Sequence, residues 1–196
     1  MQAAAVILAA GASTRFGSPK QLARIGDRTM LEAVVELAVS AGLAPIIVVV
    51  PSGLPPPAGV TPVINDEPRA GMSRSLRLGL AAVPADVSAA VVLLGDQPTV
   101  SIRTLDALLE VAAVTDRPVV AAHANGRVGP PVVLARSAFM LAGEAAGDEG
   151  LRRVFEEHAD LLATVEVGEH TPDVDTPADL AALGRIAHMF DSRARR

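Results

Sequence analysis

Short apolar segments recur along the chain and alternate with segments of helical periodicity, which constrains the fold more than any other feature of the sequence. Each apolar segment is rich in β-branched residues and continuous rather than alternating, as expected of strands that are covered on both faces. These segments are Ala3–Leu8, Ile46–Val50, Ala89–Leu94 and Val119–Ala122. The alternation predicts an α/β fold with a doubly wound, mostly parallel sheet. In such sheets, ligands bind beyond the carboxyl ends of the strands.

Helical patterns occupy the intervals between the predicted strands. Two of them cover Met30–Ala41 and Met72–Ala82, and a third begins after Ser101, its predicted N-cap. Near the end of the chain, Thr176 and Asp179 have the spacing of a capped helix start, with a proline at the first helical position.

The sequence predicts one domain. No internal repeat, low-complexity block or linker interrupts residues 1–190, and residues 191–196 read as a solvated basic tail. The proline-rich stretch Pro51–Pro62 is predicted to be a loop, because its prolines cannot serve a central strand.

The composition excludes several classes of protein. The chain has no cysteine, so disulfides, Cys-zinc sites and thiol chemistry are excluded, which fits a reducing cytoplasm. The net charge of −5 argues against a broad nucleic-acid-binding surface. No apolar run approaches the roughly 20 residues that a membrane span needs. We therefore expect a soluble, cytoplasmic protein that binds neither nucleic acid nor membrane.

The loop after the first apolar segment has the composition of a phosphate-binding loop. It covers Gly11–Lys20 and reads GASTRFGSPK. Glycines let the backbone approach a ligand, and Ser13 and Thr14 can donate to phosphate oxygens together with backbone amides. Arg15 supplies a guanidinium fork and Lys20 a compact charge. The spacing is neither that of a Walker loop nor GxGxxG. The alternative is an ordinary polar connection between a strand and a helix. Such connections usually have roughly 2–6 residues, so the greater length of this loop favours a functional role.

Acidic residues follow another predicted strand. Asp96 comes directly after Ala89–Leu94 and a glycine, which places its carboxylate at the ligand-binding edge of the sheet. Facing a triphosphate it would hold Mg²⁺, and the alternative is that it only starts a turn before Pro98. Asp173 and Asp175 are two residues apart, so on an extended segment either or both could reach the same metal.

Three ordered motifs resemble those of the molybdenum cofactor cytidylyltransferases, within the small MobA/MocA-like nucleotidyltransferases. They are LAAGASTRFGSPKQL after the first strand, LLGDQP around Asp96 and DVDTPADL from Asp173. Further matches are Asn65, Gly71–Gly79 and Gly147–Arg152. The likeness covers about Val6 to Leu183 and implies the Rossmann-like nucleotidyltransferase fold.

The resemblance implies a role for each matched residue. Arg15, Lys20 and Asp96 would be catalytic, and Asp96 would bind Mg²⁺ with Asp175 and Asp173. The implied nucleotide-binding residues are Leu8, Ala10, Gly11, Ser13, Arg15, Lys20, Asn65, Gly71 and Ser75. Ala10, where guanylyltransferase relatives usually have glycine, favours the cytidylyl branch.

The implied reaction joins the cytidylyl group of CTP to the terminal phosphate of a molybdopterin-type cofactor and releases pyrophosphate. A phosphate monoester is already largely dianionic at neutral pH, so the reaction needs no general base. An apo-molybdoenzyme that receives the product is the further partner that the resemblance suggests.

Two departures from the family pattern bear on the substrates. Phe16 replaces the usual methionine and leaves Arg15 and Lys20 in register, whereas Gly129-Pro130-Pro131 replaces a more common Gly-His-Pro. Because this histidine is missing, the sequence determines the identity of the acceptor substrate less well than that of the nucleotide. The alternatives are guanylyl or other nucleotidyl transfer to this or another small phosphorylated acceptor, and a non-catalytic nucleotide- or cofactor-binding chaperone.

Overall fold

The four predicted apolar segments form adjacent or near-adjacent strands of one sheet. The computed structural model describes residues 2–147, 151–168 and 173–183. The sheet has seven strands in the order β5-β4-β1-β6-β8-β7-β9. Their bounds are β1 Ala3–Leu8, β4 Ile46–Pro51, β5 Thr61–Asn65, β6 Ala89–Leu94, β7 Val119–Ala124, β8 Arg127–Ala135 and β9 Leu162–Glu166. A separate two-stranded ribbon is formed by β2 Arg24–Ile25 and β3 Arg28–Thr29.

Most strand pairs in the large sheet are parallel. Strand β1 pairs in parallel with β4 and β6, β4 with β5, and β7 with β9. Only β8 runs antiparallel, between β6 and β7. The predicted doubly wound, mostly parallel α/β fold is thereby confirmed.

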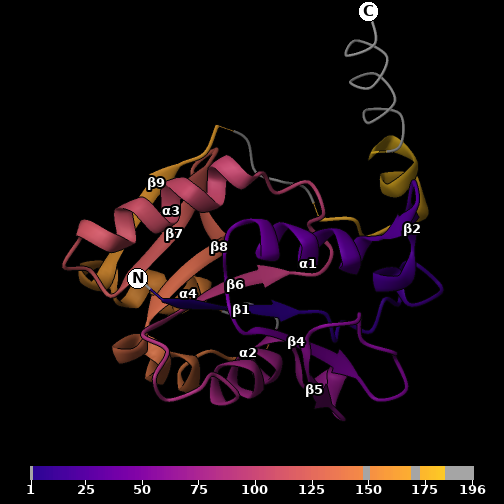
Figure 1. Cartoon of the computed structure of the whole chain (residues 1–196), viewed down its shortest axis with the longest axis horizontal. Coiled ribbons are helices and arrows are strands. Elements are labelled where there is room, and N and C mark those ends of the chain that lie inside the picture. Colours follow the sequence, from indigo (N-terminus) through magenta and orange to yellow (C-terminus); the bar gives the residue numbers. More distant parts are fainter. Residues whose placement is uncertain (1, 148–150, 169–172, 184–196) are drawn as a thin grey trace, which may run out of the picture.

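Helices cover both faces of the sheet (Figure 1). Their bounds are α1 Met30–Ser40, α2 Met72–Ala81, α3 Ile102–Val114 and α4 Arg152–Glu157. The 3-10 helices are η1 Lys20–Leu22, η2 Pro68–Ala70, η3 Arg136–Gly143 and η4 Ala159–Leu161. Helices α1 and α3 pack on one face, and α2, η3 and α4 on the other. Neighbouring residues of β1 point to opposite faces, so Val6 contacts the α2 side and Ile7 the α1 side. Both faces of the central strands are therefore buried, which explains their continuous apolar sequence.

The predicted helix starts are confirmed. The Ser101 hydroxyl accepts a hydrogen bond from the Thr104 amide at the start of α3. Thr176 and Asp179 form a reciprocal capping box, in which the Asp179 amide donates to Thr176 Oγ1 and the Thr176 amide donates to Asp179 Oδ2. Residues 177–183 are helical after this cap.

Three strands of the large sheet were not predicted, each for a physical reason. Strand β5 contains Pro62 and lies at the sheet edge, where a missing amide donor is tolerated. The predicted loop Pro51–Pro62 was therefore wrong at both ends, since Pro51 is the last residue of β4. Strand β8 contains Pro130 and Pro131 and follows β7 through Asn125-Gly126, whose positive φ angles of 51° and 73° suit a two-residue hairpin turn. Strand β9 is a partly exposed edge strand without a continuous apolar run.

No helix in the described ranges is long and apolar enough to cross a membrane. The predicted basic tail at 191–196 lies outside the described residues.

Candidate active site

A cavity of about 480 Å³ opens at the carboxyl ends of β1 and β6. This volume is in the range of small-molecule binding sites, roughly 300–1,000 Å³. Four separate parts of the chain line it, namely residues 8–15 with 20–21, residues 68–69, 71–72 and 75, residues 94–96, and residues 173 and 175. The position agrees with the rule that parallel sheets bind ligands beyond the carboxyl ends of their strands.

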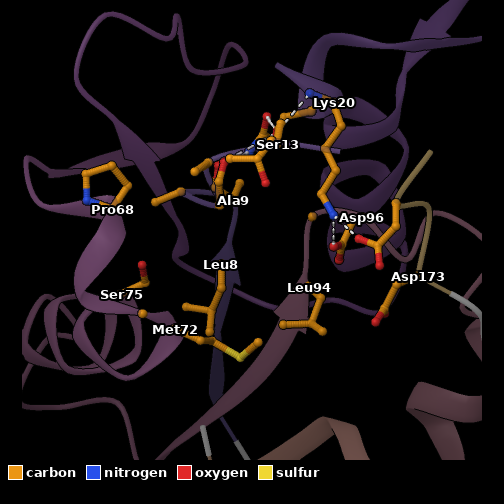
Figure 2. A pocket seen from close by; sticks show the side chains of 18 of the residues that line it. Leu8, Ala9, Ser13, Lys20, Pro68, Met72, Ser75, Leu94, Asp96 and Asp173 are labelled. Atoms are coloured by element: carbon orange, nitrogen blue, oxygen red, sulfur yellow. Dashed lines mark hydrogen bonds and ion pairs between the residues drawn. The ribbon is translucent and has the colours of Figure 1, made fainter. Parts of the chain in front are cut away.

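Lys20 joins two of the predicted acidic residues inside this cavity (Figure 2). Its Nζ atom donates to Asp96 Oδ2 at 2.6 Å and to Asp175 Oδ1 at 2.8 Å. Arg15 Nη2 lies 2.7 Å from the other oxygen of Asp175. Two cations and two carboxylates, all predicted from the sequence, thus form one continuous cluster.

The electrostatics of the cluster keep Lys20 charged. Burial by itself would lower the pKa of Lys20, but the charge of Asp96, the nearby Asp175 and the hydrogen bonds to both carboxylates raise this pKa above its ordinary value. The Lys20 ammonium compensates the two carboxylates, since buried charges without a partner are costly.

The segment that carries Asp173 and Asp175 is anchored between these two residues. The Val174 amide donates to the Asp96 carbonyl at 3.0 Å, and the Val174 side chain is buried in a small cluster with Met30 and Leu183. Asp173 accepts from Gln97 Nε2 at 2.8 Å, and burial, together with the charge of Asp96, raises the pKa of Asp173. Asp173 and Asp175 both line the cavity, as their spacing of two residues allows.

The opposite wall of the cavity comes from η2 and the start of α2. Figure 2 shows Pro68, Met72 and Ser75 across the cavity from Lys20 and Asp96. These apolar and hydroxyl groups suit the flat ring and sugar of a nucleoside, and Arg69 adds a cation to the same wall.

Asn65 and Gly71 shape this wall. Asn65 is fully buried at the end of β5 and does not line the cavity; its Nδ2 atom donates at 2.9 Å to the Oγ atom of Ser75, which does. Gly71 has a φ of +88°, and a Cβ atom there would lie 2.5 Å from the backbone carbon of Gly147. Only glycine fits this close approach.

The two acids that face Lys20 fit a divalent cation. Asp96 Oδ2 and Asp175 Oδ1 converge on the same Nζ atom, which marks a point where both oxygens can contact one cation. Oxygen ligands are those that Mg²⁺ prefers, and it binds through one or two carboxylates together with phosphate oxygens and water. Within the described ranges, no group of three or more His, Asp or Glu side chains could hold a metal alone. A metal here would therefore need ligands from the substrate.

Sequence reasoning missed several residues of the site. Gln21 and Gln97 are buried polar residues that contact the loop and Asp173, and the partners of a glutamine side chain cannot be read from the sequence. Lys20 was predicted from the loop, and the composition gives a second signal for it, because it is the only lysine in the chain. All other basic side chains apart from histidine are arginine.

A family model decides the class of protein. The MobA-like NTP transferase domain matches residues 5–161, which is more than half of the chain. The chain belongs to this family. The matched region of this NTP transferase includes Lys20 and Asp96 but ends before Asp173 and Asp175, and the structure places these two acids at the same site.

Solved structures agree with the family. The homolog of Rv0371c from Mycobacterium sp. strain JC1 is 26% identical, with a TM-score of 0.84, over 97% of this chain and 100% of that one. Rv0371c of Mycobacterium tuberculosis, in complex with manganese, is 29% identical with a TM-score of 0.78, over 94% and 99%. A CMP:2-keto-3-deoxy-manno-octonic acid synthetase complexed with CTP is 19% identical with a TM-score of 0.76, over 96% and 99%, and shows the shared fold. No match was found among curated proteins.

Proposed function

We propose that this NTP transferase moves the cytidylyl group of CTP to the terminal phosphate of a molybdopterin-type cofactor and releases pyrophosphate. The observation that carries the proposal is the meeting of Lys20 and Arg15 with Asp96 and Asp175 in one cavity at the sheet edge. Cations for a polyphosphate and carboxylates for a divalent metal are the two parts that phosphoryl-type chemistry requires.

The cations are assigned by their position and exposure. Lys20 is nearly buried and lies between the acids, so it is the group for the oxygens of the α-phosphorus. Arg15 is 71% exposed and lies at the outer side of Asp175, which suits the departing pyrophosphate. Both bind charge that increases in the transition state, so their contacts favour the reaction rather than only binding.

Asp96 and Asp175 are the proposed ligands of Mg²⁺, with Asp173 as a further candidate. When bound, the metal would neutralise negative charge on the phosphates. Manganese in the Rv0371c structure supports a divalent cation in a relative of similar fold. In this chain, the convergence of two carboxylate oxygens on one point supports the assignment.

No residue of the cavity is needed as a general base. The acceptor phosphate is largely dianionic at pH 7, and the cavity is lined by no histidine or cysteine in the described part of the chain. Catalysis then consists of holding the two phosphates in line and stabilising charge. Cytosine as the base is supported by Ala10, which lines the cavity, and by the CTP complex of the synthetase with the same fold.

A nucleotide panel tests the proposal. Pyrophosphate release is measured with CTP, GTP, ATP and UTP, each with molybdenum-loaded and metal-free pterin as acceptor. We expect release with CTP that depends on the acceptor and on Mg²⁺. Release with GTP alone would indicate guanylyl transfer. Release only with another phosphorylated acceptor would overturn the assignment of the pterin as acceptor. Binding of nucleotide without release would favour a chaperone.

A further inference from the structure

In the loop that follows β1, several carbonyl groups have hydrogen-bond partners, whereas a run of backbone amides has none within the described ranges. The carbonyls of Ala9 and Gly11 accept hydrogen bonds from Gln21, and the carbonyl of Ser13 accepts from the amides of Phe16 and Gly17. Within the described ranges, the backbone amides of residues 10–15 donate to no protein group. All of these residues line the cavity. The loop therefore presents donors, while several of its acceptors are occupied.

The sequence explains why Ala9 needs a side-chain donor. The Ala9 amide continues the parallel ladder by donating to the Val49 carbonyl at 2.8 Å. In the continuing ladder the Ala9 carbonyl would accept from residue 51, but Pro51 has no amide hydrogen. Gln21 Nε2 donates to this carbonyl at 2.8 Å instead. A buried carbonyl that the sheet leaves unpaired is thereby satisfied.

Gln21 uses all parts of its side-chain amide on this loop. Its second Nε2 bond goes to the Gly11 carbonyl at 3.0 Å, and its Oε1 atom lies 3.3 Å from Ser13 Oγ. Ser13 Oγ in turn accepts from the Lys20 amide at 3.1 Å. Gln21 is 2% exposed, so water does not compete for these bonds. Both ends of the loop are thus tied through one side chain.

We propose that Gln21 is a positioning residue for the polyphosphate: it occupies the carbonyls of Ala9 and Gly11 and holds the loop in the shape that leaves the backbone amides of residues 10–15 as donors for phosphate oxygens. Unoccupied carbonyls would repel the same oxygens, so the residue acts through the polarity and shape of the loop. The proposal rests on the proposed function only in assuming that the polyphosphate of a nucleotide binds in this cavity. It does not depend on the base or on the acceptor.

The test uses the full chain and three probes, which are inorganic pyrophosphate, CTP and cytidine, with Mg²⁺ present. Gln21→Met keeps the size of the side chain and removes both donors. We expect calorimetric affinity for pyrophosphate and CTP to fall at least tenfold, while affinity for cytidine changes less than twofold. In amide NMR spectra, the signals of residues 10–15 should shift with pyrophosphate in the wild type and not in the variant. Val120→Ala, a buried change on β7, is the control for a general loss of stability.

Pyrophosphate binding by Gln21→Met within threefold of the wild type would overturn the proposal. Should this variant fail to fold, Ser13→Ala removes the hydroxyl between Gln21 and Lys20 and should weaken pyrophosphate at least threefold; unchanged affinity would again count against it. Wild-type protein that binds pyrophosphate tightly but never releases it from CTP would contradict the proposed transfer and leave the role of Gln21 intact.

Discussion

Lys20 determines the state of the two acids in the cavity. Without it, Asp96 and Asp175 would face one another across a partly buried space, where like charges are unfavourable. The ammonium group lies where both carboxylate oxygens converge, so a divalent cation that uses these oxygens must displace it. A triphosphate that arrives with the metal offers Lys20 a new anionic partner. Binding of metal and of nucleotide should therefore support each other.

Lys20→Met should separate these two effects. Since the variant removes the competing charge, it should bind Mn²⁺ about tenfold more tightly than the wild type, which corresponds to roughly 1.4 kcal/mol. Addition of Mn²⁺ should also raise the Tm of the variant more than it raises the Tm of the wild type. The kcat for CTP should fall about a hundredfold, with a smaller change in KM. Mn²⁺ affinity is measured by electron paramagnetic resonance. Arg28→Met, at an exposed pair with Glu36, is the control, and equal Mn²⁺ affinity in both variants would contradict the competition.

Asp96→Asn tests the proposed metal ligand with almost no change in shape. Loss of the charge should lower metal-dependent pyrophosphate release by about a hundredfold or more, because charge stabilisation is the main catalytic contribution expected here. Thermal unfolding should remain cooperative. Asp66→Asn, the same change at an exposed ion pair with Arg74 outside the cavity, should retain activity. Full activity of Asp96→Asn would remove Asp96 from the chemistry.

The sequence predicts where the chemical groups gather but not how they pair. Lys20 and Asp96 each follow a strand that can be recognised from its residues, so their common edge follows from the parallel topology. Their hydrogen bond joins positions 76 residues apart, and the bond from Lys20 to Asp175 spans 155. No local pattern encodes such pairs. The same holds for Gln21, whose role depends on Pro51 in a neighbouring strand.

At the scale of elements, helix α2 lies unusually close to the sheet. A Cβ atom on Gly79 would lie 2.4 Å from Val6 Cγ1 on β1 and 3.0 Å from Val49 Cγ2 on β4. Both valines are fully buried, so neither can move freely. This contact fixes the height of α2 above the sheet, and with it the positions of Met72 and Ser75 at the cavity wall.

Gly79→Ala should therefore destabilise the protein, although alanine is normally the better helix former. Overpacking costs about 1–3 kcal/mol and exceeds the helix-propensity gain of roughly 1 kcal/mol. The net cost of up to about 2 kcal/mol should lower the Tm by up to roughly 8 °C in calorimetry. Gly143→Ala, at an exposed glycine where a Cβ meets nothing within 4 Å, is the matched control and should be neutral. Equal Tm values for the two variants would show that α2 can move away from the sheet.

At the scale of the whole molecule, part of the cavity wall comes from residues 173 and 175, near the end of the described chain. Residues 173–175 reach the loop after β6 through the Val174 backbone bond to Asp96. The Val174 side chain packs in a small cluster with Met30 and Leu183, apart from the two large clusters on the faces of the sheet. A change in this small cluster should therefore move Asp173 and Asp175 without loosening the packing of the sheet.

Val174→Ala should accordingly reduce activity more than stability. Two lost carbon atoms correspond to about 1–2 kcal/mol, and the sheet should stay folded. We expect kcat/KM for CTP to fall at least fivefold, because Asp173 and Asp175 lose their anchor. Val133→Ala, which removes the same atoms from the buried part of β8, should lower the Tm at least as much and keep kcat/KM. A parallel loss of activity in both variants would contradict this expectation.

The sole lysine has a practical consequence for chemical labelling. Apart from the terminal amine, the chain offers an acylating or aldehyde reagent one primary amine, and that amine lies inside the proposed catalytic cavity. Reductive methylation with ¹³C-formaldehyde would place a reporter methyl group there without altering the charge. Conversely, attachment to a sensor surface through amines would compete with substrate, so immobilisation should use another handle.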